Sequence, residues 1–305
     1  MDGGYLATKK ILVAGSSGLI GTALVSSLQS DGHEVCRLVR RPVKAANEIH
    51  WDPESGLLEG NALEGFDVII HLGGEGIGDK RWSKSRKEKI LTSRVVSSKL
   101  LSEKIAILDS KPEVFILANA IGWYGSRGEE ELTEESKKGE GFLSEVCLEW
   151  ESSAEAVQDS GIRTIYLRSG IVLSSSGGVL AKMLPPFKLG IGGKMGSGKQ
   201  WMSWISLDDE VGAITHLMNN KKCNGAYNLT APEPVTNYEF TKTLGRTLKR
   251  PSILPLPGFM LRILFGSRAI SLMIEGQKVL PKRLQESGYI FNHSTLGEAL
   301  SDLLV

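Results

Sequence analysis

Short apolar segments alternate with longer amphipathic segments through the first two-thirds of this 305-residue chain. A strand covered on both faces is apolar along its whole length, and two parallel strands need a crossover connection long enough to hold a helix. The spacing therefore predicts an α/β fold in which helices cover both faces of a parallel sheet. The predicted strands are Lys10–Ala14, Glu34–Val39, Asp67–Leu72, Val114–Asn119 and Thr164–Leu167, and the predicted helices are Leu19–Ser30, Ser83–Leu108 and Phe142–Ser160.

The pattern changes at about Gly177. Irregular glycine-rich and proline-rich stretches begin there, among them Pro185-Pro186 and residues 190–198, and three helical patterns follow. We expect a sheet domain over residues 1–176, with sheet contributions from later segments, and a smaller lobe over residues 177–305. The helical patterns are Asp208–Asn219, where Asp208 and Asp209 are predicted to be N-cap residues, Asn237–Lys249 and Phe259–Phe265.

Composition excludes several classes of protein. Charges nearly balance, with 36 Lys plus Arg against 35 Asp plus Glu, so the chain lacks the basic excess that binding to nucleic acid requires. Cys36, Cys147 and Cys223 form no CxxC motif and the five histidines are scattered, so neither disulfides nor a metal site is predicted. No apolar run is long enough for a membrane span, and residues 1–10 lack the apolar core of a signal peptide. We expect a cytoplasmic protein, or an organellar one if a targeting segment has been removed.

The first predicted strand leads directly into a glycine-rich turn. Its sequence, Gly15-Ser16-Ser17-Gly18-Leu19-Ile20-Gly21, has GxxGxxG spacing and precedes a predicted helix. The first glycine permits a tight turn, the second lets the backbone approach a pyrophosphate, and the third lets the helix pack closely on the strand. Free N–H groups at the helix N-terminus can then bind the anion. The motif predicts a dinucleotide-binding site; the alternative is an ordinary tight turn between a strand and a helix.

The end of the second predicted strand indicates which dinucleotide is bound. A site selective for NAD has an acidic residue there, which binds the ribose 2′-hydroxyl. This chain has no acid at that position and instead has Arg40 and Arg41 after Val39. Guanidinium groups bind the 2′-phosphate of NADP through charge-assisted hydrogen bonds, so the sequence favours NADP(H). The alternative is that both arginines are simply solvated at a loop end.

Further motifs resemble extended short-chain dehydrogenases/reductases of the NAD(P)-dependent epimerase family. Within that family the chain is most similar to an atypical group that includes human short-chain dehydrogenase family 39U member 1 and bacterial proteins labelled as cell-division inhibitors. The matching segments extend almost from end to end. They include Asp67–Gly74, Arg81-Trp82, Ile121-Gly122-Trp123-Tyr124-Gly125, Leu167-Arg168-Ser169-Gly170, Ser203-Trp204-Ile205 and Glu275–Pro281.

The resemblance implies a Rossmann-like domain with a small C-terminal substrate lobe, a family-specific segment at about residues 250–300, and NADP(H) as cofactor. For one implied contact, Arg94, the alternative is an ordinary exposed charge on a helix. The cofactor contacts implied by the resemblance are residues 15–21 at the pyrophosphate, Val39, Arg40 and Arg41 at the ribose phosphate, Leu72 and Gly73 through their backbone, and Arg94.

The residues that perform chemistry in the extended family are replaced in this chain. That family uses a Tyr-x-x-x-Lys pair on a helix, in which the lysine lowers the tyrosine pKa so that the phenol can exchange a proton during hydride transfer. Here Cys147 and Glu151 occupy the two positions, and a carboxylate raises the pKa of a neighbouring acid. The supporting Ser/Thr of the family is missing too, because Asn119-Ala120 stands in its place.

Two residues remain as catalytic candidates. Tyr124 follows a strand at the carboxyl edge of the sheet, where it can donate a proton, stack on the nicotinamide, or be a packed aromatic. Glu151 can accept hydrogen bonds from the nicotinamide ribose in place of the lysine, or be a solvated helix carboxylate. Trp201 and Trp204 can line a substrate pocket or pack between the two lobes.

Two functions agree with these observations. The first is an NADP(H)-dependent oxidoreductase or epimerase that acts on an unidentified small molecule between the sheet and the C-terminal lobe. The alternative is a catalytically silent NADP(H)-binding protein with a regulatory or interaction role. The glycine loop supports both functions, and the missing Tyr-Lys pair supports the alternative.

Overall fold

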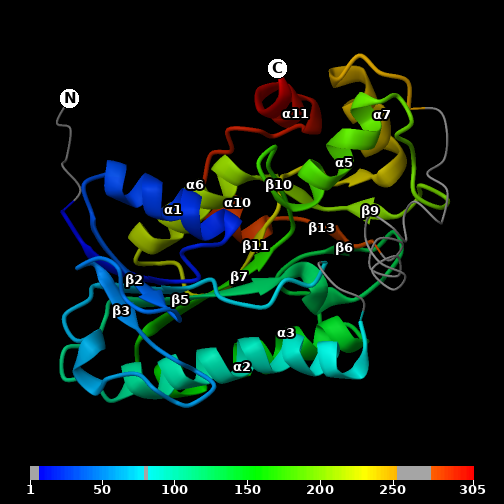
Figure 1. Cartoon of the computed structure of the whole chain (residues 1–305). Helices are drawn as coiled ribbons and strands as arrows, with labels where there is room; N and C mark the ends of the chain where they lie inside the picture. Colours follow the sequence, from blue (N-terminus) through cyan, green and yellow to red (C-terminus); the bar gives the residue numbers. More distant parts are fainter. Residues whose placement is uncertain (1–6, 79–81, 253–275) are drawn as a thin grey trace.

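A seven-stranded parallel sheet forms the centre of the computed structural model, which describes residues 7–78, 82–252 and 276–305 (Figure 1). The strand order is β11-β7-β5-β4-β1-β2-β3. The predicted α/β class is confirmed, and all five predicted strands are present with small shifts of their ends. The strands are β1 (Lys10–Ala14), β2 (Glu34–Val39), β3 (Glu48–His50), β4 (Val68–His71), β5 (Val114–Ala120), β7 (Arg163–Ser169) and β11 (Gly225–Leu229).

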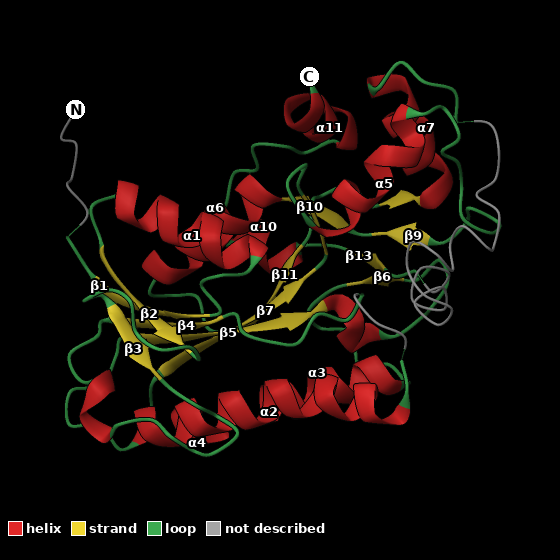
Figure 2. Cartoon of the chain, in the orientation of Figure 1, coloured by secondary structure: helices red, strands yellow, loops and turns green. Residues whose placement is uncertain are grey.

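Helices cover both faces of this sheet (Figure 2). Successive side chains of a strand point to opposite faces, so β1 gives Ile11 and Val13 to one apolar core and Leu12 and Ala14 to the other. The strands are thus buried on both sides, which explains their apolar sequences. The first core is covered by α1 (Leu19–Ser30) and α6 (Leu207–Asn219), and the second by α2 (Lys84–Ala106), α3 (Phe142–Ser152) and α4 (Glu155–Asp159).

One predicted helix is wrong in its extent. The segment Phe142–Ser160 was expected to form a single helix, but it divides into α3 and α4 around Ser153-Ala154. The Val157 N–H donates at 3.0 Å to the hydroxyl of Ser102 on α2, rather than to the backbone carbonyl one turn before it. This tertiary hydrogen bond interrupts the ladder of the longer helix, and the local sequence pattern gives no sign of it.

The later residues form a smaller lobe around a third apolar core, which includes Phe187, Trp204 and Phe240. Figure 1 shows α5, α7 and α11 together on the side of this lobe away from the sheet. Its helices are α5 (Gly178–Lys188), α7 (Asn237–Thr247) and α11 (Leu296–Leu304), and its two-stranded sheets pair β8 (Ile171–Leu173) with β10 (Trp204–Ser206) and β9 (Trp201–Met202) with β12 (Val235–Thr236). The short helix α10 (Lys282–Glu286) instead packs through Leu284 against the first core beside β11, and β13 (Lys278–Val279) pairs with β6 (Glu131–Leu132).

Two expectations for the residues after Gly177 are wrong. Pro185-Pro186 was placed in an irregular stretch, but it lies inside α5, because that helix buries Leu180, Met183 and Phe187 in the third core and this burial outweighs the lost backbone donors. The N-cap of α6 is Ser206 rather than Asp208 or Asp209. Asp209 instead has a fully buried side chain that accepts backbone N–H bonds from residues 292 and 293.

The predicted helix Phe259–Phe265, together with Arg81 and Glu275, lies outside the described residues. The same holds for residues 253–275 of the family-specific segment expected at about residues 250–300. Within the described part of the chain, no helix combines the length and apolar character needed to cross a membrane.

Candidate functional site

The loops after β1 and β4 meet at the point where the strand order reverses. From β1 the chain proceeds to β2 and β3 on one side, and from β4 to β5 and β7 on the other. Open α/β sheets bind ligands in a crevice at such a reversal, which here falls at the carboxyl ends of β1 and β4. Gly15 has φ +81°, and a Cβ there would lie 2.6 Å from the Gly73 nitrogen and 2.7 Å from the Leu72 carbonyl carbon. These two loops can therefore approach one another only with glycine at position 15.

The other two glycines of the loop present a helix N-terminus at this crevice. A Cβ on Gly21 would lie 2.2 Å from the Gly15 carbonyl oxygen, so α1 packs against the loop too closely for a side chain. Gly18 is the N-cap of α1, no side chain caps the helix, and its first turn has no acid. Ser17 and Gly18 are exposed, and Ile20 packs against the first core. The loop thus has the shape and the free N–H groups that a pyrophosphate requires.

The structure separates the two arginines that the sequence treats as a pair. Arg41 donates both terminal nitrogens to Glu48 on β3, at 2.6 and 2.9 Å, and Glu48 also accepts the Lys44 N–H at 2.8 Å. These hydrogen bonds, led by that of Arg41, lower the pKa of Glu48 to about 2. Arg40 is exposed and has no hydrogen bond or ion pair to any described residue. A carboxylate therefore does lie near the end of β2, but it comes from β3 and faces Arg41.

Arg94 lies beneath the loop that follows β4. Its guanidinium donates to the carbonyl oxygen of Glu75 at 3.0 Å, packs against Gly74, and lies 4.9 Å from the ring centre of Trp150. Burial lowers the pKa of Arg94 to about 10. Arg94 is thus no exposed helix charge, because it supports the loop that carries Gly73.

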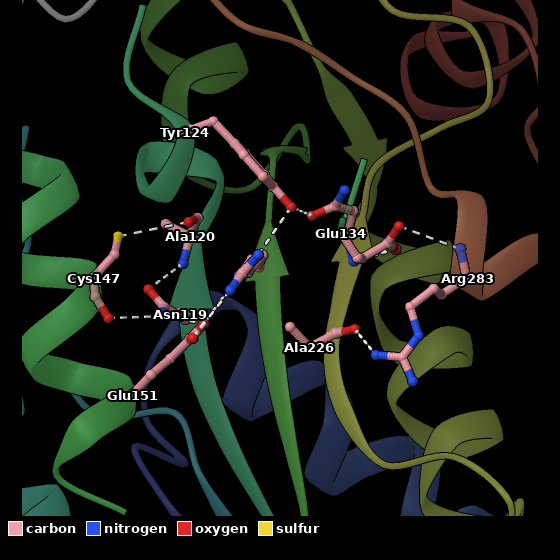
Figure 3. Close-up of polar contacts among 10 residues, drawn as sticks. Asn119, Ala120, Tyr124, Glu134, Cys147, Glu151, Ala226 and Arg283 are labelled. Atoms are coloured by element: carbon pink, nitrogen blue, oxygen red, sulfur yellow. Dashed lines mark hydrogen bonds and ion pairs between the residues drawn. The ribbon is translucent and has the colours of Figure 1, made fainter. Parts of the chain in front are cut away.

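A buried polar network occupies the carboxyl ends of β5 and β7 (Figure 3). The Tyr124 hydroxyl donates to Asn228 Oδ1 at 2.7 Å and accepts from Arg168 Nη1 at 3.1 Å. Arg168 also donates to both oxygens of Glu151, at 2.9 and 3.0 Å, and its guanidinium stacks 3.9 Å above the ring centre of Trp123. Tyr124 is fully buried, and burial raises its pKa to about 12. Both catalytic candidates therefore belong to one network centred on Arg168.

The residues at the Tyr-x-x-x-Lys positions also have partners inside this network. Cys147 is buried, its Sγ donates to the Ala120 carbonyl oxygen at 3.5 Å, and burial together with Glu151 raises its pKa to about 12. Asn119 donates to Glu151 Oε1 at 2.8 Å (Figure 3). Cys147 thus has the environment of a core residue, and Glu151 is held from two strands.

The two tryptophans have partners within the protein. Trp204 is fully buried in the third core and donates to the Glu233 carbonyl oxygen at 3.1 Å. Trp201 donates to Glu129 at 3.0 Å, with Lys278 Nζ 4.7 Å from its ring centre. Their contacts agree with packing between segments. No group of three His, Cys, Asp or Glu side chains in the described ranges is arranged to hold a metal ion.

Sequence reasoning missed Glu48 and Arg168 as members of this region. Arg168 could have been recognised from the sequence, because a cation inside an otherwise apolar strand needs a buried partner. Glu48 could not, because its role depends on a loop that brings Arg41 into contact with β3.

The chain is similar to known proteins along most of its length. The profile of the NAD dependent epimerase/dehydratase family matches residues 11–230, and that of a domain of unknown function matches residues 256–303. Epimerase family protein Mb2239 from Mycobacterium bovis is 41% identical over 295 residues, which cover 97% of each chain. The SDR39U1 homologue of Arabidopsis thaliana, described as chloroplastic, is 37% identical and covers 96% of this chain and 86% of its own. The crystal structure of human epimerase family protein SDR39U1 with NADPH has a TM-score of 0.87 and 35% identity, with 96% of this chain and 98% of that chain covered.

Proposed function

The chain belongs to the NAD dependent epimerase/dehydratase family, and we propose that it binds NADP(H) in the crevice between β1 and β4 and acts as an oxidoreductase or epimerase on an unidentified small molecule. The observation that carries the proposal is the glycine cradle. Side chains at Gly15 and Gly21 would collide with backbone atoms at 2.6 and 2.2 Å, and the close approach leaves the N-terminus of α1 open to an anion. The NADPH in the crystal structure of the human relative supports the same cofactor here.

We propose that the residues around this crevice bind different parts of the cofactor. Backbone N–H groups of residues 15–21 hold the pyrophosphate, and Val39, Leu72 and Gly73 contact the cofactor through their backbone. Arg40 binds the ribose 2′-phosphate, because its guanidinium is free of described partners, whereas Arg41 is held by Glu48. Arg94 positions the loop after β4. Bound NADP(H) supplies or accepts a hydride.

The environment of Tyr124 and Glu151 favours positioning roles for both. A proton donor must reach the substrate, but the Tyr124 hydroxyl is fully buried between Asn228 and Arg168 and has a pKa of about 12. The Glu151 carboxylate neutralises Arg168. Together they fix the ends of β5 and β7 against α3, and the proton must come from another group.

Titration of the purified protein with NADPH and with NADH, followed by a library of carbonyl compounds, tests this function. We expect tight NADPH binding, weaker NADH binding, and oxidation of NADPH in the presence of one class of carbonyl. A protein that does not bind NADPH would overturn the proposal. Tight NADPH binding without turnover across the library would assign the alternative, a silent NADP(H)-binding protein.

Tyr124→Phe separates a direct role of the phenol from a positioning role. Complete loss of turnover with unchanged NADPH affinity would identify Tyr124 as the proton donor. We expect partial loss, accompanied by lower stability, because the substitution removes the hydroxyl from the Asn228–Arg168 network. Tyr238→Phe is the matched control, since Tyr238 is half exposed on α7.

We further propose that residues 1–176 form the NADP(H)-binding domain, completed by β11, and that residues 177–305 form the substrate lobe. Three free cysteines support a reducing, cytoplasmic location. Limited proteolysis with and without NADPH tests the domain boundary, and imaging of a fluorescent fusion tests the location.

A further inference from the structure

The end of β7 carries a hydroxyl beside the position where the extended family has its supporting Ser/Thr. Ser169 is the last residue of β7, and its register partner on β5 is Ala120. Side chains at paired positions of neighbouring strands point to the same face of the sheet. The hydroxyl that is missing at Ala120 is therefore present one strand away, at the same carboxyl edge. Ser169 is partly exposed, whereas Tyr124 is fully buried.

The hydroxyl of Ser169 contacts the buried carboxyl group of Glu210. Glu210, in the first turn of α6, is fully buried, and its Oε1 lies 2.6 Å from Ser169 Oγ. Its Oε2 has no hydrogen-bond partner. Burial raises the pKa of Glu210 to about 8, so it retains a proton at neutral pH. Burying a carboxyl group that has only one hydrogen-bond partner lowers the stability of the folded protein, whereas burying an apolar side chain at the same position would not. Such a group is therefore a candidate for a functional role.

No cation faces Glu210 from the described elements packed against α6. Three of these elements, α1, β8 and β10, have no charged side chain. Each charged group on β7 and α6 other than Glu210 either has another hydrogen-bonding partner or is exposed to solvent. These groups are Arg168 (paired with Glu151), Arg163 (bonded to carbonyl oxygens at the end of α6), Asp208 (exposed), Asp209 (bonded to Ser206 and to Tyr289, which follows α10) and His216 (bonded to Ser287). Ionised Glu210 is thus stabilised by the Ser169 hydroxyl alone.

We propose that Ser169 and Glu210 form a proton relay that replaces the Tyr-Lys pair of the extended family; this inference rests on the proposed NADP(H)-dependent function. Ser169 Oγ gives its hydrogen to the oxygen of a bound aldehyde or ketone as the Glu210 proton moves to Ser169 Oγ. The carbonyl carbon takes a hydride from NADPH, so C=O becomes CH–OH and NADPH becomes NADP⁺. Glu210 is left as a carboxylate that accepts from Ser169, until a solvent proton restores it. Ser169 is the catalytic residue, and Glu210 acts through it.

Four variants test the relay: Ser169→Ala, Ser169→Thr, Glu210→Gln and, as a matched control, Glu113→Gln. Glu113 precedes β5 at the opposite edge of the sheet, where it pairs with Lys9. The first measurement needs no substrate: infrared titration of the NADPH complex follows the protonated carboxyl band between pH 5 and 10. We expect a band that disappears near pH 8 in the wild type and in Glu113→Gln, and that is missing in Glu210→Gln.

The second measurement is turnover of the carbonyl compound that the library identifies. We expect Ser169→Ala and Glu210→Gln to lower kcat/KM by roughly 10²- to 10⁴-fold, the usual contribution of general acid–base catalysis, with NADPH affinity unchanged. Ser169→Thr, which keeps the hydroxyl, restores most of the activity. The wild-type rate of carbonyl reduction falls above about pH 8, and this fall is lost in Glu210→Gln.

Each failure has its own signature. Unchanged turnover in Ser169→Ala, or a pH profile in Glu210→Gln equal to that of the wild type, would overturn the relay and leave the proposed function standing. NADPH binding without any turnover would overturn the relay as well, and would assign a binding role to the protein. Failure to bind NADPH would overturn the proposed function itself.

Discussion

The Glu48 carboxylate on β3 accepts hydrogen bonds from both terminal nitrogens of Arg41, so the charge of one of the two arginines after β2 is neutralised within the protein. The side chain of Glu48 is 4% exposed and that of Arg41 is 45% exposed, so the carboxylate is the fixed partner and the guanidinium is drawn onto it. Glu48 also holds the backbone of Lys44. One buried acid thus shapes the loop after β2 and leaves Arg40 as the free cation.

This asymmetry predicts different effects for the two arginines. Arg40→Ala should weaken NADPH binding by about 1.5–3 kcal/mol, the scale of a hydrogen bond to a charged group, with little change for NADH. Arg41→Ala should weaken NADPH less, because its charge is already paired. Isothermal titration calorimetry with both cofactors measures these differences. Equal weakening of NADPH and NADH by Arg40→Ala would contradict the assignment.

The glycine loop predicts that binding and stability can be separated. Gly18→Ala should abolish tight NADPH binding but change the free energy of unfolding by no more than about 1 kcal/mol, because its Cβ would meet only the Gly15 carbonyl at 3.4 Å. Gly21→Ala should lose binding and also about 1–3 kcal/mol of stability, because its Cβ would overlap the loop backbone. Gly297→Ala, with open space around it, is the control. Urea unfolding and NADPH titration of the same samples provide the comparison, and equal stability losses for Gly18 and Gly21 would refute the geometry.

The Glu151–Arg168 ion pair predicts a large loss of stability when one partner is removed. Glu151→Gln leaves the Arg168 guanidinium, whose side chain is 5% exposed, without its counter-ion, and should cost about 3–5 kcal/mol. Glu145→Gln, which breaks a more exposed pair with Lys138, should cost at most about 1 kcal/mol. Chemical denaturation measures both variants. A loss below 1 kcal/mol in Glu151→Gln would show that Arg168 does not depend on this carboxylate.

Glu210 predicts how stability changes with pH. Its folded pKa, about 8, lies above its unfolded value, so between about pH 4.5 and 8 the folded state holds a proton that the unfolded state has released. Stability from this group is therefore present in full below pH 4.5 and is lost as pH rises to about 8, by at most about 1.4 kcal/mol per pH unit. Glu210→Gln should remove this slope. Denaturation midpoints of both proteins from pH 5 to 9 measure it, and parallel curves would contradict the raised pKa.

The elements that sequence reasoning predicted well are those set by local signals. β1, β2 and α1 match their predicted bounds, because an apolar run, a glycine turn and an amphipathic period each identify an element without help from distant residues. The break between α3 and α4 was not predicted, because it depends on Ser102 of another helix. The edge strand β11 was not predicted either, because its sequence mixes polar and apolar residues.

In the candidate site, too, the features set by local sequence were predicted and those set by contacts between distant residues were not. The glycine loop is continuous in the sequence, and its geometry follows from its spacing. Glu48, Arg168 and Glu210 each act on a residue of another element, and nothing in their own neighbourhoods indicates which one. Pairing of this kind depends on strand order and register, which a single sequence does not contain.

The place of β11 at the edge of the sheet also sets the order in which the protein can be completed during synthesis. β11 pairs with β7, yet its last residue is made 60 residues after the end of β7 (229 − 169). At about 5–20 residues per second, the ribosome leaves the β7 edge open for roughly 3–12 seconds. An open edge is a template for pairing with other chains. The nascent chain thus passes through a period in which six strands of the sheet have been synthesised but the strand that covers the β7 edge has not.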